Sequence, residues 1–131
     1  MKPQVLIVEN SRTMRETLRL LLCGEFDCVL VVNAEEGLAR MQERPPDLLL
    51  SDVSLDKVDG YELCRQVRAD PRLQHLPVIL VSGYAPRLGD ASVVHPDAYF
   101  TKPVKPAELI ARMHSLLRPP PPRDVLPEKS V

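Results

Sequence analysis

The stretch PDLLLSDVSLDKVDGYEL, from Pro46 to Leu63, contains the pattern that decides the fold. Its apolar run, Leu48 to Leu50, is continuous rather than alternating, which is typical of a strand buried on both faces. Such strands occur in parallel sheets that helices cover on both sides. The run ends in Ser51 and Asp52, and the segment SLDKVDG that follows is rich in turn-forming residues, with Gly60 expected to supply backbone freedom.

Short apolar runs recur along the chain, and helical patterns separate them. The further runs are Val5 to Val8, Cys28 to Val32, Val78 to Val81 and Ala98 to Phe100. Apolar residues at helical spacing are Met14, Leu18, Leu21 and Leu22, then Leu38 and Met41, then Leu63 and Val67, then Leu109, Met113, Leu116 and Leu117. Because crossovers between parallel strands are right-handed, this alternation predicts a doubly wound, five-stranded parallel α/β sheet with helices on both faces.

Two segments depart from this alternation. Gly83 to Pro96 reads GYAPRLGDASVVHP and leaves space only for a short or irregular fourth helix. The end of the chain, RPPPPRDVLPEKSV, begins at Arg118, and a proline run of this kind is extended and buries little. We expect one folded domain over residues 1–118 and a proline-rich tail or linker over residues 119–131. That tail could lead to an output domain, end the protein or dock on a proline-binding module.

The composition excludes several classes of function. The 131 residues include 17 Lys and Arg against 18 Asp and Glu, a net charge of -1, so there is no basic field for direct nucleic-acid binding. No apolar run is long enough to span a membrane, and the N-terminus lacks a signal-peptide pattern. The sequence has 3 cysteines, an odd number, and no CxxC motif, which argues against a disulfide framework and against a zinc site. We therefore expect reduced thiols and a cytoplasmic protein.

Polar residues stand at the ends of four predicted strands. They are Glu9 and Asn10, Ser51 and Asp52, Ser82 and Gly83, and Thr101, Lys102 and Pro103. The carboxyl ends of parallel strands lie along one edge of the sheet, which is where ligands bind in doubly wound folds. Two carboxylates, an amide, a hydroxyl and an ammonium are therefore expected to converge there.

The stretches VLIVENSRTMRETL, PDLLLSDVSLDKVDGYEL, LPVILVSGYA and DAYFTKPV together resemble the receiver domain of bacterial response regulators, of the chemotaxis CheY type. The resemblance covers Met1 to about Leu117. It implies a flavodoxin-like fold with five helices. It also implies a Mg²⁺-dependent phosphoacceptor, not an enzyme in the usual sense, that is served by a sensor histidine kinase or phosphotransfer protein. Phosphorylation would switch a surface for a downstream effector protein or a fused output domain.

The resemblance also implies a role for each matching residue. Asp52 would accept the phosphoryl group, Lys102 would pair with the aspartate or its phosphate, and Ser82 would hydrogen-bond a phosphoryl oxygen. Tyr99 matches an aromatic switch that turns inward, and Lys102-Pro103 matches a bond that is usually cis. The positions that match the metal site are Glu9, Asn10, Asp52 and the backbone carbonyl of Ser54, whose oxygens suit Mg²⁺.

Three residues depart from the family pattern. Asn10 stands where the family usually has an acid, so the site has two carboxylates rather than three, and we expect weaker Mg²⁺ binding. Asp56 stands where proline is frequent, and no firm consequence follows. Tyr84 lies where a side chain can line the path of the hydrolytic water, so a ring that excludes water predicts slow loss of the phosphoryl group, whereas a ring flat on the surface does not.

Two other classes of function remain open. Asn10 and the irregular segment from Gly83 to Pro96 favour a pseudo-receiver, a protein-binding module that works without phosphate. An unrelated small enzyme is disfavoured, because a haloacid-dehalogenase-like hydrolase would need an aspartate at Ser54 and no phosphate-binding glycine loop is present.

Overall fold

A computed structural model of the protein describes residues 2–85 and 95–118. The elements in chain order are β1 (Gln4–Val8), α1 (Arg12–Leu22), β2 (Asp27–Val31), α2 (Ala34–Glu43), β3 (Leu48–Asp52), α3 (Gly60–Ala69), β4 (Val78–Ser82), β5 (Ala98–Thr101) and α5 (Pro106–Leu117). From β1 to β4, strand and helix thus alternate along the chain as the apolar patterns predict.

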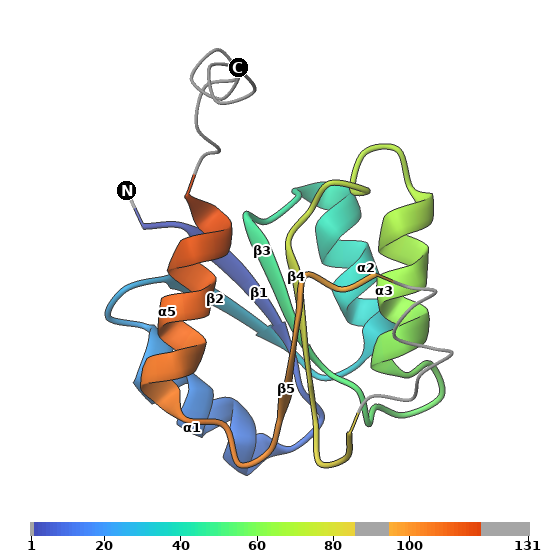
Figure 1. The fold of residues 1–131 in the computed structure, drawn as a ribbon. Coiled ribbons are helices and arrows are strands. Elements are labelled where there is room, and N and C mark those ends of the chain that lie inside the picture. The colour runs from blue at the N-terminus through green and yellow to red at the C-terminus, as the bar shows by residue number, and fades with distance from the viewer. Residues whose placement is uncertain (1, 86–94, 119–131) are drawn as a thin grey trace, which may run out of the picture.

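The five strands form one parallel sheet in the order β2-β1-β3-β4-β5. Helices α1 and α5 cover one face of this sheet, and α2 and α3 cover the other (Figure 1). This is the doubly wound, flavodoxin-like arrangement that was expected, and the strand order reverses between β1 and β3. The reversal places the carboxyl ends of those two strands beside a crevice, where ligands bind in such folds.

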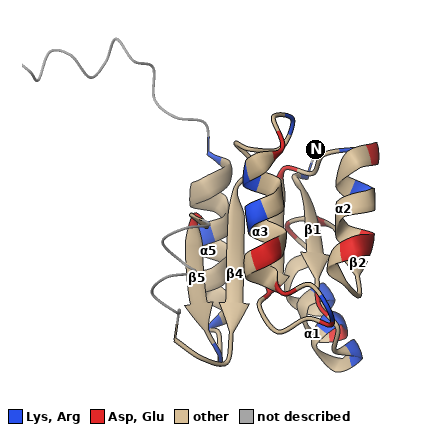
Figure 2. Ribbon diagram, turned by 90° about the vertical axis from the view of Figure 1, so that its right-hand side faces the viewer, with Lys and Arg blue, Asp and Glu red and all other residues tan. Residues whose placement is uncertain are grey.

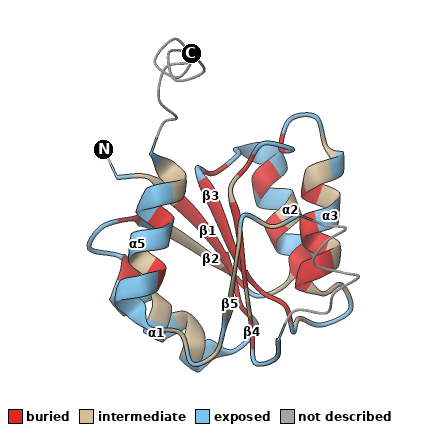
Figure 3. Cartoon of the chain, in the orientation of Figure 1, coloured by how far each residue is buried: buried red, intermediate tan, exposed pale blue. Residues whose placement is uncertain are grey.

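Alternation along the strands divides the apolar core into two layers. Figure 3 shows buried residues along the central strands and on helices at both sides of the sheet. On β1 and β3, Leu6, Val8 and Leu49 pack toward α2 and α3, whereas Ile7 and Leu50 pack toward α1 and α5. Both sets are almost completely buried, which explains why the apolar runs are continuous in sequence. Each fully buried Leu or Ile side chain contributes about 1.5–3 kcal/mol of hydrophobic stabilisation, so the central strands are held firmly.

Local signals set the starts of the helices. Ser11, Asn33 and Asp59 are the N-cap residues of α1, α2 and α3, and each side-chain oxygen accepts a backbone N–H three residues on. Helix α5 begins at Pro106, where a missing N–H removes no intrahelical hydrogen bond. Asp59, which belongs to the segment predicted to be turn-forming, thus marks the start of α3.

The structure refines some sequence predictions and leaves others outside the described residues. Strand β2 begins and ends one residue earlier than expected, so Val32 lies beyond it and is exposed. The described residues contain four helices, and most of the segment predicted as a short or irregular fourth helix, residues 86–94, lies outside them. The predicted tail, residues 119–131, also lies outside them.

The charged residues on α2 and α3 are mixed in sign. Both helices carry acidic and basic residues on the side of the molecule that Figure 2 shows. Neither helix therefore offers the uniformly basic surface that binding to a phosphate backbone requires. Among the described helices, none is long and apolar enough to cross a membrane.

Candidate functional site

Asp52 is the last residue of β3, and its side chain is only 5% exposed. Its Oδ2 accepts a hydrogen bond from Nζ of Lys102 at 3.1 Å, and its Oδ1 accepts the backbone N–H of Ser54 at 3.3 Å. Lys102 follows β5, and its backbone N–H donates to the carbonyl of Ser82 at 2.8 Å. The predicted cis bond between Lys102 and Pro103 is present. A buried carboxylate and a partly exposed ammonium therefore face each other at the carboxyl edge of the sheet.

Glu9 follows β1 and is almost completely buried beside Asp52. Its Oε2 accepts the backbone N–H of Ser11 at 3.0 Å. Burial raises the pKa of the Glu9 carboxyl above its ordinary value, and the charge of Asp52 raises it further, while the Ser11 N–H and Lys102 oppose the shift. Two buried carboxylates, Glu9 and Asp52, therefore lie near one ammonium group, that of Lys102. Because one positive charge cannot balance two negative ones, this arrangement favours the binding of an added cation.

The donor set suits a hard divalent cation such as Mg²⁺, which prefers oxygen ligands. Glu9 and Asp52 supply carboxylate oxygens close to each other, whereas Asn10 is exposed and supplies an amide at most. Over residues 2–85 and 95–118, no group of three His, Cys, Asp or Glu residues could hold a metal ion. The site therefore offers two negative charges and not three.

Ser82 ends β4 and is buried. Its Oγ accepts the backbone N–H of Tyr84 at 3.1 Å, so the hydroxyl has a capping role in this structure. The Tyr84 side chain stands out from the surface, with the residue 77% exposed. Tyr99 on β5 is half-buried, and its hydroxyl donates to the Tyr84 carbonyl at 3.1 Å. The residues predicted to respond to phosphate are therefore already connected to one another.

Two hollows lie on either side of this cluster. One, of about 510 Å³, lies between α1 and α5 and is lined mostly by apolar side chains, with Glu9, Asp52 and Lys102 among its walls. The other, of about 490 Å³, is lined by Val53, Ser54, Asp59, Tyr61, Ser82, Tyr84, Ala85 and Tyr99. Small molecules can therefore approach the end of β3.

Gly60 has a different role from the one that its sequence context suggests. No described glycine has a positive φ, so backbone freedom is not what this position requires. A Cβ on Gly60 would instead collide with the carbonyl oxygen of Asp52 and lie 2.8 Å from Cα of Val53. The prediction that Gly60 supplies backbone freedom was therefore wrong. A glycine fits here because the start of α3 packs directly on the backbone of β3 at the site.

Sequence reasoning missed two side chains that support the site. Nη1 of Arg15, on α1, donates to the carbonyl of Glu9 at 2.8 Å. The hydroxyl of Tyr61, on α3, donates to the hydroxyl of Tyr99 at 3.2 Å. Neither residue follows a strand, so the strand-end pattern carried no signal for them.

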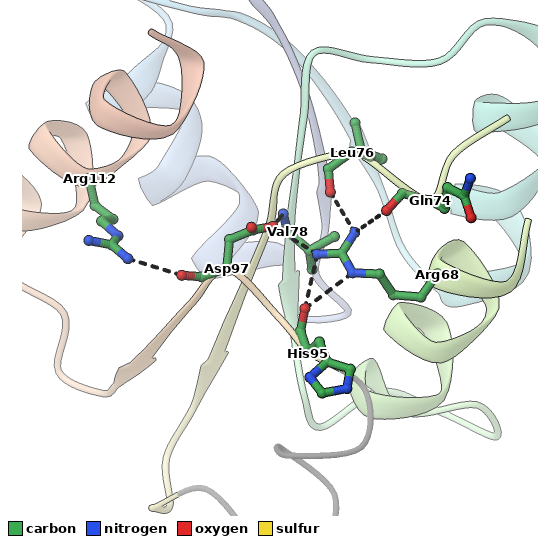
Figure 4. Close-up of polar contacts among 7 residues, drawn as sticks. All are labelled: Arg68, Gln74, Leu76, Val78, His95, Asp97 and Arg112. Carbon is green, nitrogen blue, oxygen red and sulfur yellow. Dashed lines mark hydrogen bonds and ion pairs between the residues drawn. The ribbon is translucent and has the colours of Figure 1, made fainter. Parts of the chain in front are cut away.

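A polar network around Arg68 holds the start of β5, the strand that carries Tyr99 and leads to Lys102 (Figure 4). The guanidinium group donates to the carbonyls of Gln74, Leu76 and His95 over 2.7–3.2 Å and to Oδ2 of Asp97 at 2.8 Å.

Asp97 is the point at which further contacts meet. Its Oδ2 also accepts the Val78 N–H at 2.8 Å, and its carbonyl accepts a hydrogen bond from Arg112. Contacts from α3, β4 and α5 therefore meet at Asp97.

The comparisons with known proteins agree with this geometry. The family model described as "Response regulator receiver domain" matches residues 5–114. The chain is 35% identical over 121 residues to the phosphate regulon transcriptional regulatory protein PhoB of Rhizobium meliloti, covering 90% of this chain and 53% of that protein. It is 36% identical to a 14.6 kDa protein of Leptolyngbya boryana, covering 88% of this chain and 92% of that one. The chain thus spans about half the length of PhoB.

Solved structures support the same grouping. A response regulator from Chloroflexus aurantiacus has a TM-score of 0.83 and 30% identity over 89% of this chain and 98% of its own. The chemotaxis response regulator CheY4 of Vibrio cholerae has a TM-score of 0.81 over 88% of this chain and 99% of its own, and its 20% identity supports the fold alone. With a family match over residues 5–114 and relatives above 30% identity, this chain belongs to the response regulator receiver domains of two-component systems.

Proposed function

We propose that this protein accepts a phosphoryl group on Asp52 from a sensor histidine kinase or a phosphotransfer protein. The observation that carries the proposal is the position of the Asp52 carboxylate, buried at the end of β3 with the Lys102 ammonium 3.1 Å away and Glu9 beside it. Membership of the receiver family supports the same assignment. In this proposal the protein acts in the cytoplasm as a phosphoacceptor and not as a classical enzyme.

In the proposed reaction, a carboxylate oxygen of Asp52 bonds to phosphorus while the bond from phosphorus to the donor's nitrogen breaks. Negative charge develops on the phosphoryl oxygens, so the chain's contribution is positioning and neutralisation. Lys102 supplies positive charge, and Ser82 would exchange its contact with the Tyr84 N–H for one with a phosphoryl oxygen. Mg²⁺, held by Glu9, Asp52, Asn10 and the Ser54 carbonyl, would neutralise further charge.

The proposed output follows from the contacts of Ser82. Its hydroxyl is linked through Tyr84 to Tyr99, so movement of Ser82 would release or re-form the Tyr99 contact. A surface that includes Tyr99 would then bind a downstream effector protein or a fused output domain differently. We also predict slow hydrolysis of the phosphoryl group, because the Tyr84 ring would keep water away from it. For this, the exposed ring would have to move over the end of β3.

The test is intact-mass analysis after incubation with acetyl phosphate and Mg²⁺. We expect one added phosphoryl group on the native protein and none on Asp52→Asn. Lys102→Met should be phosphorylated at least about tenfold more slowly, because a charge-assisted contact contributes roughly 1.5–3 kcal/mol. Lys105→Met is the matched control, because Lys105 is 79% exposed and lies 3.9 Å from Glu108. An equal adduct on Asp52→Asn would contradict the proposal.

A second candidate, binding of a partner without phosphorylation, is favoured by one observation, the exposed Asn10 in place of an acid. Asn10→Asp would restore a third carboxylate. If the protein is a phosphoacceptor with a weakened metal site, this variant should bind Mg²⁺ more tightly and be phosphorylated at lower Mg²⁺ concentration. Absence of an adduct in both proteins, even with a histidine kinase as donor, would favour the second candidate.

A further inference from the structure

Helices α1 and α5 lie on the same face of the sheet (Figure 1), and the hollow of about 510 Å³ between them has mostly apolar walls. Met14, Leu18 and Leu21 line it from α1, and Leu109 lines it from α5. Of the 11 residues of α1, Leu22 alone is buried. The described part of the chain therefore leaves apolar side chains between these two helices exposed to water, which favours an occupant that covers them.

One end of this hollow is acidic. Glu9 and Asp52 both line it there, and both residues are buried. The ammonium of Lys102, which lines the same end, is 3.1 Å from Asp52. Because two carboxylates face one ammonium, the local charge attracts a further positive group. An occupant with an apolar part and a cationic part therefore fits the hollow.

The segment of the chain that follows α5 has these two parts in its sequence. Arg118, the C-cap residue of α5, has extended backbone angles, φ −72° and ψ 132°, so the chain leaves the helix axis there. The sequence after it is PPPPRDVLPEKSV. Its apolar pair is Val125 and Leu126, and a lysine, Lys129, comes three residues after the pair.

The segment is long enough to return to the hollow. Leu109 comes nine residues before Arg118, which corresponds to about 14 Å along the axis of α5. Leu126 comes eight residues after Arg118, and eight extended residues span up to about 26 Å. The chain can therefore turn at the end of α5 and bring Leu126 back beside Leu109.

The spacing between the apolar pair and the lysine also matches the hollow. Leu21 and Met14 are seven residues apart on α1, which corresponds to about 10 Å along the helix axis. The three residues from Leu126 to Lys129 span about 10 Å when extended. With Leu126 beside Leu21, the lysine lies near the start of α1, at the acidic end of the hollow.

We propose that the segment 125–129 of this chain folds back and occupies the hollow between α1 and α5. Its apolar pair covers Leu18, Leu21 and Leu109, and its Lys129 ammonium lies toward the carboxylates of Glu9 and Asp52. Removal of apolar surface from water drives the docking, and the charge at one end of the hollow sets the direction in which the segment lies.

This inference does not rest on the proposed function. It uses the apolar walls and the charges of the hollow, whether or not Asp52 accepts a phosphoryl group. The experiment below contains neither a phosphoryl donor nor Mg²⁺, so its result and that of the acetyl phosphate experiment are independent of each other.

The test is limited digestion of the full chain with trypsin, followed by intact-mass analysis. Trypsin cleaves after Arg123, two residues before Val125, but not after Arg118, which precedes a proline. The reference is a synthetic peptide of residues 118–131. Because cleavage follows the fraction of time that a segment is undocked, the full chain should be cut after Arg123 at least about tenfold more slowly than the peptide. Equal rates would overturn the proposal.

Two neighbouring leucines of α1 provide a matched pair of variants. Leu21→Gln places an amide in the wall of the hollow and should bring the cleavage rate close to that of the peptide. Leu20→Gln is the control, because Leu20 is 83% exposed and is not among the residues that line the hollow. Thermal melts check that both variants fold. Equal acceleration by the two substitutions would contradict docking in this hollow.

Variants of the segment itself cannot act by unfolding the domain. Leu126→Gln should abolish the protection and Lys129→Gln should reduce it, whereas Ser130→Gln should keep it, each measured against a peptide with the same change. Protection that Leu126→Gln leaves intact would overturn the proposal. Protection that appears only as the protein concentration rises would also overturn it, because the segment would then come from a second copy.

Discussion

The Tyr61 hydroxyl donates a hydrogen bond to the Tyr99 hydroxyl at 3.2 Å, and Tyr99 in turn donates to the Tyr84 carbonyl at 3.1 Å. The rings of Tyr61 and Tyr99 also stack, with centroids 6.3 Å apart. The relay connects α3, β5 and the loop after β4, and Ser82 adjoins it through the Tyr84 N–H. A change at the end of β4 can therefore reach α3 through the Tyr84 backbone and the hydroxyl groups of Tyr99 and Tyr61.

Tyrosine fluorescence is expected to report on this relay. The protein has 3 Tyr and no Trp, and all three tyrosines take part in the relay. If phosphorylation moves Tyr99, incubation with acetyl phosphate and Mg²⁺ should change the emission of the native protein. Tyr84→Phe should keep the change, since Tyr84 contributes only backbone atoms, and Asp52→Asn should lose it. An unchanged emission in a protein that carries the adduct would contradict a Tyr99 switch.

The raised pKa of Glu9 predicts that this residue costs stability at neutral pH. Above the folded-state pKa the buried carboxylate is charged, whereas below its ordinary value of 4.5 it is protonated in both the folded and unfolded states. In the absence of Mg²⁺, Glu9→Gln should therefore raise the Tm by a few degrees at pH 7, and the gain should vanish as the pH falls below that value. Thermal melts of both proteins between about pH 4 and 8 measure this difference. A gain that grows in acid would show that the sign of the shift is wrong.

Gly60→Ala should destabilise the protein by about 1–3 kcal/mol, because the new methyl group meets the Asp52 backbone. The substitution should also slow phosphorylation, since the carboxylate would move with its own backbone. Gly24→Ala is the matched control, because a Cβ there meets nothing within 4 Å, and its effect should stay within about 0.5 kcal/mol. Urea denaturation and the acetyl phosphate reaction measure the two effects. Equal stability of the two variants would exclude the close approach of α3 to β3.

Arg68→Met should lower the free energy of unfolding by about 2–3 kcal/mol. The Arg68 side chain is 21% exposed and donates to three carbonyls and to Asp97, and its removal leaves the carbonyl of the buried Leu76 without this charged donor. Arg65→Met serves as the control, since Arg65 is 58% exposed and contacts Glu62 on its own helix. Urea denaturation of both variants should show a loss for Arg68 that is several times larger. Similar losses would mean that the network contributes no more than a surface ion pair.

Much of the fold could be predicted from local patterns. The continuous run Leu48 to Leu50 indicated a strand covered on both faces, and that strand lies between two core layers. The residues at the strand ends, Glu9, Asp52 and Lys102, converge because parallel strands place their carboxyl ends along one edge. Their assignment to phosphoryl transfer came from the family resemblance and stays a proposal at the level of single residues.

The tertiary structure decided what depends on distances between separate elements. Gly60 is required because α3 lies against the carbonyl of Asp52, and its sequence context suggested a turn instead. Tyr61, placed by an amphipathic helix, meets Tyr99 only because α3 and β5 lie near each other across the end of β4. Periodic patterns report which face of an element is buried, whereas a contact also depends on the angle and separation at which two elements pack.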